Sequence, residues 1–547
     1  MNLYLSPMRI IYTLLAIALC PIMQAQVVSS EFMEHYTIDD VEEVLEEFGL
    51  PVNFLPINYE VDFYKIIYMT EHPNGEMVEV SGALLVPSDV DCPLPLSSYQ
   101  HGTIAAKSDA PSQGGDELLL GVLYASVGIA CTLPDYIGLG ESDGFHLYIH
   151  ADSEASTSMN LVIAAHDLQE ELNYNLNGQH VIWGYSQGGH ATLALQKLWE
   201  EEYVEEYNLI ASAPMSGPYD VSGVQAEVIT SDNYYPTPGY LPYVVLSYQE
   251  VYGNLYDDLG DLFIEPYAGL IQDLFDGVNG MGYINSQLPD IPNEMLLPDQ
   301  LEDFQNNPEN PMRIALEDND LYDWTPQVQT RLYYCEGDDQ VNYMNSVIAE
   351  EFFAENGSTS VTALDGGDYD HSDCAPLAML GGFNFFQDVI EPSFNPQIDI
   401  EVTDASAIGA EDGAISVTAD DITGWSFDWS NGSTGAELDG LSVGFLVLTI
   451  TNDQGCTAEF DVSVGVMTGL ELAESIAFSV FPNPTSESTK ITFSSSMLCL
   501  QIVAPTGQIV AQQQMSSGEE LPLSNLEVGV YSLMTTDGRF LSRIVKF

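Results

Sequence analysis

Apolar and polar positions alternate in blocks along the chain up to about residue 394. Five short apolar runs predict buried strands at residues 94–99, 128–133, 181–183, 209–215 and 331–335. The stretches between them predict helices at residues 118–127, 155–172 and 190–199. Because strands alternate with helices, the pattern indicates an α/β fold whose parallel sheet is covered on both faces.

One long segment, residues 223–324, interrupts this rhythm. It is crowded with Tyr, Leu, Asp and Pro, and it places about a hundred residues between two predicted strands, far more than a connection requires. We expect it to form a cap over an active site. A loose surface insertion is the alternative.

From Pro396 the pattern changes to short alternating strands separated by Gly, Asn and Asp turns, which is typical of all-β structure. A chain of 547 residues is too long for one core, so several domains are expected. We predict an α/β domain at residues 26–394, followed by two small β-sandwich domains at residues 395–467 and 473–547.

The N-terminus is typical of a secretory signal peptide, here residues 1–25. Arg9 precedes an apolar run at residues 10–19, and Ala25 stands at the expected cleavage site. The run is too short to span a membrane, and no later segment is long and apolar enough to do so. Cys20 suggests a lipoprotein, but Leu19 before it does not suit that motif. The protein is therefore expected to be exported, to the medium or the cell surface.

Cysteines and charge narrow the possibilities further. Six cysteines follow the signal segment, a sparse set for an exported chain. Among them, Cys335 and Cys374 can be bridged, or they can be buried free thiols. The net charge of −73 comes from 83 acidic and 10 basic residues. It excludes nucleic acid and anionic membranes as partners, because both need a basic surface. It predicts a saline habitat; calcium binding is the alternative, but no D-x-[DN]-x-[DN]-G loop is present.

The most informative motif is Gly184-Tyr-Ser-Gln-Gly-Gly189. It lies between the apolar run at 180–183 and the predicted helix at 190–199. This strand–turn–helix setting is that of the nucleophile elbow of α/β-hydrolases, in which a strained serine exposes its hydroxyl at the sheet edge. Ser186 is the predicted nucleophile.

A serine nucleophile needs a histidine base, and the base needs a carboxylate that orients it. In this fold the chain order is Ser, acid, His, and His371 is the sole histidine after His190. The acid is expected just after the strand at 331–335. The pattern G-x-x-D-x-x-V favours Asp338, while its shorter glycine spacing here leaves Asp339 open.

The oxyanion hole requires two main-chain amides. One is expected from Gln187, which follows the nucleophile, and the other from Thr103 or Gly102 after the strand at 94–99. His101 in that loop is interpreted as structural, and Asp135 as a turn residue. His146, His150 and Asp152 have loose metal-ligand spacing, but no motif supports zinc, so no metal or cofactor is predicted.

With these motifs placed, the region before residue 395 resembles the secretory lipase family, the α/β-hydrolases like Candida antarctica lipase A. The resemblance is carried by Tyr99-Gln100, P-D-Y-x-G-x-G at 134–140, G-Y-S-x-G-G-H-A at 184–191, the long insertion, and the segments G-D-D and D-H-S-D-C-A-P. It implies a triad of Ser186, Asp338 and His371, a helical cap, and hydrolysis of small-molecule or lipid carboxylic esters without a cofactor.

The C-terminal segments carry resemblances of their own. W-S-N-G at 429–432 and D-x-G-C at 453–456 resemble the SprB-type repeat of bacterial surface proteins, an immunoglobulin-like sandwich. P-N-P-T at 482–485, G-V-Y at 529–531 and the basic end resemble the C-terminal sorting domain of the type IX secretion system. This second resemblance implies that the secretion machinery is a partner.

The sequence thus predicts an exported serine ester hydrolase of the lipase or esterase class. Two alternatives stay open. A serine peptidase can use the same fold and triad, and a non-catalytic surface adhesin can be built on an inactive hydrolase.

Overall fold

The computed structural model describes residues 26–47, 55–391, 394, 396–452 and 455–466, and seven short C-terminal stretches. These stretches are residues 478–481, 488–493, 498–504, 509–526, 529–535 and 540–546, with the longer of them carrying most of the last sheets. The predicted signal peptide lies outside the described residues. In the part of the chain that is described, no helix has the length and apolarity needed to cross a membrane.

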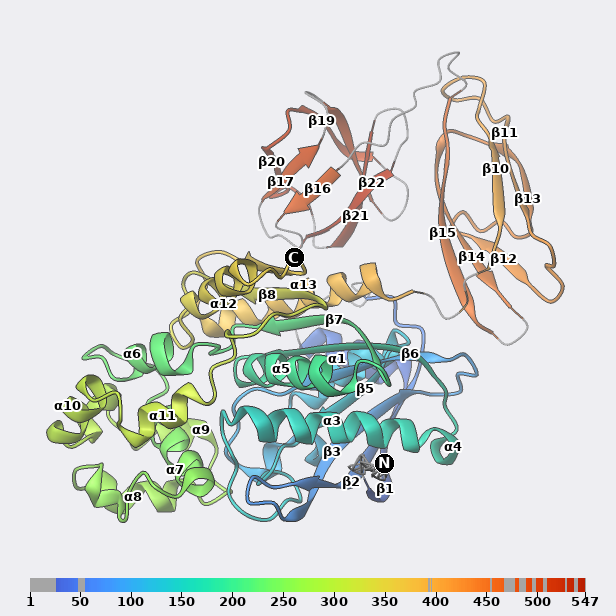
Figure 1. Cartoon of the computed structure of the whole chain (residues 1–547). Helices are drawn as coiled ribbons and strands as arrows, with labels where there is room; N and C mark the ends of the chain where they lie inside the picture. Colours follow the sequence, from blue (N-terminus) through green and yellow to red (C-terminus); the bar gives the residue numbers. More distant parts are fainter. Residues whose placement is uncertain are drawn as a thin grey trace, which may run out of the picture.

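The central sheet contains nine strands within the described residues, in the order β1-β2-β3-β5-β4-β6-β7-β8-β9 (Figure 1). The first strands are antiparallel: β1 (Val27–Tyr36), β2 (Val61–Glu71) and β3 (Met77–Pro87). The strands that follow are parallel to one another: β4 (Leu94–Gln100), β5 (Ala130–Pro134), β6 (Leu176–Tyr185), β7 (Asn208–Met215), β8 (Gln329–Tyr334) and β9 (Val361–Asp365). The α/β fold class is confirmed. The sheet is mixed, because β3 pairs with β5 in antiparallel orientation.

Helices cover both faces of this sheet. Along β6, Val181 and Trp183 point to one apolar cluster and Ile182 points to the other, as the period of a strand requires. The first face carries α1 (Ile38–Glu47), α2 (Leu118–Ser126) and α13 (His371–Val389). The second carries α3 (Ala151–Asp167), α4 (Gln169–Leu172), α5 (Gln187–Leu198) and α12 (Met344–Glu355). Because both faces are covered, β6 is buried where it reaches the elbow.

The connection between β7 and β8 forms a separate helical layer at one end of the sheet (Figure 1). It contains α6 (Ala226–Ile229), α7 (Tyr240–Tyr252), α8 (Tyr267–Leu274), α9 (Met281–Ser286), α10 (Pro298–Asn306) and α11 (Pro311–Glu317). Short turns of helix complete the α/β part: η1 (Lys107–Asp109), η2 (Pro111–Gln113), η3 (Trp199–Tyr203), η4 (Val221–Gln225), η5 (Leu259–Asp261) and η6 (Pro292–Met295). The helices of this layer share an apolar cluster with Tyr148 and Ile149, which belong to the loop before α3. The segment predicted as a cap therefore packs on the edge where β6 ends.

The C-terminal part consists of small antiparallel sheets, so the predicted all-β character is confirmed. Two three-stranded sheets come first, made of β10 (Asp399–Thr403), β11 (Gly413–Thr418) and β13 (Glu437–Leu441), and of β12 (Ser426–Trp429), β14 (Gly444–Thr451) and β15 (Thr457–Val464). The last two contain β16 (Phe478–Phe481), β17 (Ser488–Phe493) and β20 (Glu519–Pro522), and β18 (Leu498–Val503), β19 (Ile509–Met515), β21 (Gly529–Thr535) and β22 (Phe540–Lys546). Each pair of sheets encloses an apolar cluster.

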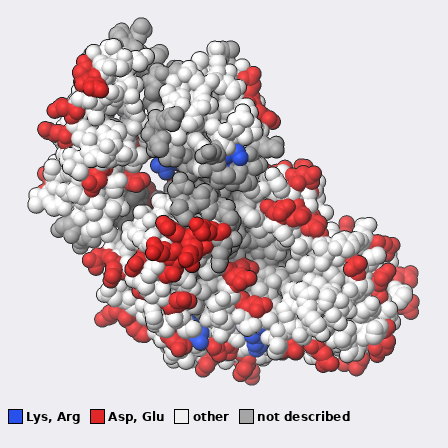
Figure 2. Space-filling view, turned by 180° about the vertical axis from the view of Figure 1, so that it is seen from behind, with Lys and Arg blue, Asp and Glu red and all other residues white. Residues whose placement is uncertain are grey.

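A disulfide that the sequence did not predict joins the first two parts. Cys92, just before β4, is bonded to Cys456, just before β15. The acidic surface expected from the composition is visible in Figure 2, where Asp and Glu are spread over the molecule and Lys and Arg are few.

Candidate active site

Ser186 occupies a strained turn between β6 and α5. Its φ of 62° and ψ of −122° are rare for a residue with a side chain, as a nucleophile elbow requires. The neighbouring glycines are required by space: a Cβ on Gly184 would lie 2.4 Å from the carbonyl oxygen of Gly188, and one on Gly188 would lie 1.9 Å from that of Gln100. The main-chain amide of Ser186 donates to the carbonyl of Met215 at 2.9 Å, which fixes the turn to β7.

His371 is the first residue of α13, and its imidazole meets Asp338. The distance from Nδ1 to Oδ2 is 2.7 Å, and both side chains are almost fully buried. The other oxygen of Asp338 accepts the amides of Gln340 and Val341, at 3.0 and 2.8 Å. The carboxylate is thus held by its own loop. It takes the hydrogen of Nδ1 and leaves Nε2 free to act on a hydroxyl.

Asp339, the alternative acid, has a different place. Its Oδ1 accepts the main-chain amide of His371 at 3.3 Å, so it contacts the backbone of the histidine. A disulfide between Cys335 and Cys374 joins the end of β8 to the first turn of α13. Of the two possibilities left open for this pair, the structure has the bridge, which ties the loop of Asp338 to the helix of His371.

The loop after β4 brings Thr103 and Gly102 to the same site, but their amides differ. The amide of Gly102 donates to both carboxylate oxygens of Glu117, at 3.2 and 3.0 Å. Glu117 also accepts a short hydrogen bond from the hydroxyl of Tyr99. Within the described residues, the amides of Thr103 and Gln187 donate no hydrogen bond. The sequence gave no sign of Glu117, because it lies in a loop with no motif of its own.

The other residues considered from the sequence are held in the protein interior. His101 faces the carbonyls of Gly102 and Asp135, at 2.7 and 3.3 Å. Asp135 accepts hydrogen bonds from Ser81 and Ser112, and burial raises its pKa. These contacts agree with structural roles for both residues.

The three residues with loose metal spacing do not converge. His150 bonds to Ser153, and His146 faces the carbonyl of Ile137 and the side chain of Gln187. Burial lowers the pKa of His146 to about 3 and that of His150 to about 4. No group of three or more metal-ligating side chains is present in the described part of the chain.

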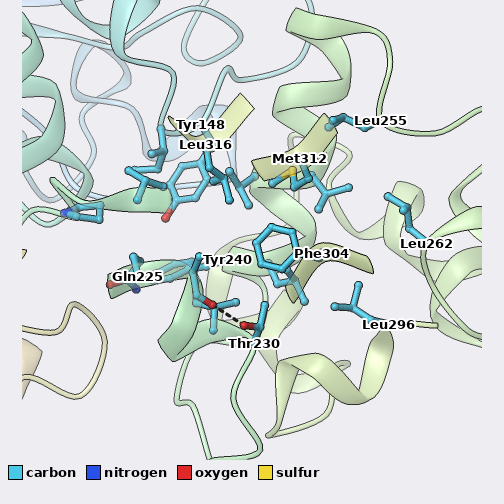
Figure 3. A pocket seen from close by; sticks show the side chains of 18 of the residues that line it. Tyr148, Gln225, Thr230, Tyr240, Leu255, Leu262, Leu296, Phe304, Met312 and Leu316 are labelled. Carbon is cyan, nitrogen blue, oxygen red and sulfur yellow. Dashed lines mark hydrogen bonds between the residues drawn. The ribbon is translucent and has the colours of Figure 1, made fainter. Parts of the chain in front are cut away.

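Two cavities meet at Ser186. One, of about 190 Å³, extends under the helical cap and is lined mainly by apolar side chains (Figure 3). Leu255, Leu262, Leu296 and Phe304 line it away from the serine. The other, of about 670 Å³, is more open and is lined by His371, Glu117 and Thr103 as well as Ser186. An ester carbonyl at Ser186 can therefore direct its two substituents into different cavities.

Solved structures similar to this chain are esterases and lipases. The rice cell wall degrading esterase LipA from Xanthomonas oryzae is 30% identical, with a TM-score of 0.59, over 66% of this chain and 97% of LipA. A protein solved as a candidate hydrolase from Legionella pneumophila is 26% identical, with a TM-score of 0.63, over 66% of this chain and 98% of that one. Candida antarctica lipase A in its closed state is 15% identical, with a TM-score of 0.51, over 66% and 81%, and shares the fold.

The C-terminal end matches a family of its own. Residues 479–546 match the secretion system C-terminal sorting domain, which confirms the type IX prediction. This domain implies an interaction with the secretion machinery and a location outside the cell or on its surface. No curated protein matches the chain significantly. With the fold, the cap and the similarity to LipA taken together, the chain belongs to the family of esterases and lipases with the α/β-hydrolase fold, and it carries a type IX sorting domain at its C-terminus.

Proposed function

We propose that the protein is an exported serine hydrolase that cleaves carboxylic esters through an acyl-enzyme. The observation that carries this proposal is the strained Ser186 at the meeting point of two cavities, one of which also contains the His371–Asp338 pair. The esterases and lipases similar to the chain support the same reaction class.

In the acylation step, the Oγ of Ser186 attacks the ester carbonyl carbon while Nε2 of His371 takes the hydroxyl proton. Asp338 holds the imidazole in the required tautomer and stabilises the imidazolium. The amides of Gln187 and Thr103 stabilise the oxyanion, aided by the positive end of α5. The tetrahedral intermediate then collapses, the bond to the alcohol breaks, and His371 gives its proton to the leaving oxygen.

In the deacylation step, water takes the place of the alcohol. His371 removes a proton from the water as it attacks the acyl carbon, and the proton passes to Oγ as the acid leaves. Ser186 and His371 are thereby regenerated. No metal or cofactor takes part in this scheme.

The two cavities suggest how an ester binds. The apolar cavity under the cap suits a hydrocarbon acyl chain, because each buried methylene contributes about 0.8 kcal/mol. The open cleft at His371 suits the alcohol, because the leaving oxygen must reach Nε2. The protein would therefore act on esters of apolar acids with more polar alcohols.

The remaining parts of the proposal concern organisation. We place the signal peptide at residues 1–25, the catalytic domain at 26–394 with its cap at 223–324, the SprB-type repeat at 395–467 and the sorting domain at 473–547. The sandwich of β10–β15, with Trp429 in its core, supports the repeat assignment.

The test is a comparison of p-nitrophenyl esters with aminoacyl and prolyl anilides. We expect turnover of the esters alone, and loss of turnover and of fluorophosphonate labelling in Ser186→Ala. Faster cleavage of anilides would make the protein a peptidase. An absence of both turnover and labelling would make it a non-catalytic surface protein.

A further inference from the structure

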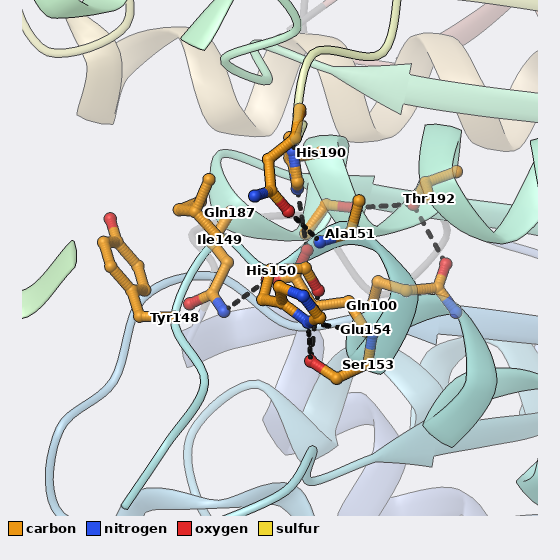
Figure 4. A network of polar contacts seen from close by, with 12 residues as sticks. Gln100, Tyr148, Ile149, His150, Ala151, Ser153, Glu154, Gln187, His190 and Thr192 are labelled. Atoms are coloured by element: carbon orange, nitrogen blue, oxygen red, sulfur yellow. Dashed lines mark hydrogen bonds and ion pairs between the residues drawn. The ribbon is translucent and has the colours of Figure 1, made fainter. Parts of the chain in front are cut away.

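A wholly buried polar network lies directly behind the nucleophile (Figure 4). The side-chain nitrogen of Gln187 donates to Oε1 of Glu154 at 2.8 Å and approaches Nε2 of His146 at 2.9 Å. The other oxygen of Glu154 lies 2.7 Å from Nδ1 of His190. Glu154 is 1% exposed and His190 is 0% exposed. The proposed mechanism uses neither of these two side chains.

The partners determine where the protons of the two histidines are. Both ring nitrogens of His190 face oxygen acceptors, because Nε2 lies 3.0 Å from the carbonyl oxygen of Asn319. His190 must therefore carry two hydrogens and a positive charge, which balances the Glu154 carboxylate. His146 points Nδ1 at the carbonyl of Ile137 at 3.0 Å and is neutral, with Nε2 accepting from Gln187. The amide nitrogen of Gln187 thus faces two acceptors, and its orientation is fixed.

Such a pair is not needed for stability. Moving two charges into the interior costs several kcal/mol per ion, and apolar residues of similar volume are often as stable. Its position indicates another role. Gln187 follows Ser186, begins α5, and carries an amide proposed to stabilise the oxyanion, so whatever fixes its side chain also restrains that amide.

We propose that Glu154 is a positioning residue: with His190 as its counter-ion, it anchors Gln187 and so holds the oxyanion amide in place. This proposal rests on the proposed function. The positive charge of His190 is part of the device. An unbalanced carboxylate behind the N-terminus of α5 would weaken the positive potential that stabilises an oxyanion.

Removing either end of the Glu154–Gln187 hydrogen bond tests the anchor. With p-nitrophenyl acetate, whose acyl group is too small to depend on the cap cavity, Glu154→Met and Gln187→Leu should each lower kcat about tenfold, and KM should stay within about twofold. The double variant should be no slower than the slower single variant, because both changes remove one interaction. Glu154→Gln should keep most activity, since its amide oxygen still accepts from Gln187 and a neutral His190 can accept from its nitrogen.

The charge balance has its own test. His190→Gln leaves Glu154 without a counter-ion and should be slower than the double variant Glu154→Gln/His190→Gln, which is neutral. Asp152→Asn is the matched control, because this exposed carboxylate lies in the same helix outside the network, and it should leave kcat unchanged. Thermal unfolding of each variant shows whether a loss of rate is a loss of fold.

The rate of Ser186 labelling by a fluorophosphonate separates this proposal from the proposed function. Labelling needs the elbow and the oxyanion amides but no ester turnover, so it should fall about tenfold in Glu154→Met and Gln187→Leu. Folded variants with wild-type kcat and labelling would overturn the proposal, and so would additive losses in the double variant. If Glu154→Met does not fold, Gln187→Leu alone decides between these outcomes. A wild-type protein that is labelled but cleaves no ester would overturn the proposed function and leave the labelling test of Glu154 intact.

Discussion

The carboxylate of Glu117 and the main-chain amide of Gly102 are joined through both carboxylate oxygens, at 3.2 and 3.0 Å. This contact fixes the loop that follows β4, one residue before the Thr103 amide. Because Gly102 is engaged, Thr103 is the better placed of the two to donate to an oxyanion.

Glu117→Ala should therefore lower kcat by about tenfold to a hundredfold, with a small change in KM, because a displaced oxyanion donor affects the transition state more than the bound ester. Glu117→Gln keeps an acceptor for the amide and should retain most activity. The neighbouring exposed Asp116 gives the control, Asp116→Ala. Equal loss in all three variants would indicate a general effect of charge in the cleft.

The two adjacent acids after β8 should behave differently. Asp338→Asn should lower kcat by about 10⁴, because it favours the wrong tautomer of His371, whereas Asp339→Asn should keep most activity, since Asp339 contacts the backbone amide alone. Steady-state kinetics on one p-nitrophenyl ester measures both. An inactive Asp339→Asn beside an active Asp338→Asn would exchange the two roles.

Acyl-chain preference should depend on the cavity under the cap. Val244, in α7, lines this cavity, so Val244→Phe should shorten it. We expect the ratio of kcat/KM for octanoate to that for acetate to fall about tenfold or more, because each methylene that is no longer buried removes about 0.8 kcal/mol. The same substitution at Val278, an exposed residue of the cap, should leave the ratio unchanged. Equal ratios in both variants would place the acyl chain elsewhere.

Stability should fall with pH as buried histidines must take up protons. Burial and the nearby His166 lower the pKa of His180 from 6.5 to about 4. Below pH 6.5 the unfolded chain binds this proton and the folded protein does not, so unfolding becomes easier as the pH falls towards 4. The full effect is about 3 kcal/mol, from 1.36 kcal/mol for each unit of pKa.

Thermal unfolding at pH 7.5 and pH 4.5 measures this effect. His180→Phe removes the titrating group, so its difference in Tm between the two pH values should be smaller than that of the wild type. His35, whose pKa is raised by its hydrogen bond to Asp62, provides the contrast: His35→Phe should lose stability that is present at low pH. An unchanged pH dependence in His180→Phe would show that this histidine is solvated.

The sorting domain should matter for export and not for chemistry. A protein that ends near Pro396 lacks the matched segment, residues 479–546, and keeps every proposed catalytic residue. Produced in the cytoplasm, it should retain esterase activity. In a host with a type IX system it should stay in the periplasm while the full chain reaches the surface or medium, as cell fractionation would show. Normal export of the truncated chain would contradict the sorting role.

The parts of this protein that local sequence predicts are those whose geometry is decided within a few residues. The elbow at Ser186 needs glycines before and after it, and β4 to β8 are short apolar runs, so both were visible in the sequence. The antiparallel strands β1 to β3 were missed. β1 is an edge strand with mostly exposed side chains, and its position follows from pairing with β2.

Contacts between distant segments could not be predicted in the same way. Glu154 and His190 are 36 residues apart and meet because α3 and α5 pack on the same face of the sheet. Glu117 reaches Gly102 across a turn with no motif. The pairing of Cys92 with Cys456 spans 364 residues and depends on how two domains meet.

That last bond changes what a proteolytic cut can do. The chain passes from the α/β part to the first sandwich in the region of residues 390–398, and Cys92 and Cys456 lie on opposite sides of this junction. A protease that cuts there leaves the two pieces covalently attached. The enzyme would then stay with its C-terminal domains, and release from a surface anchored through them would require reduction as well as cleavage.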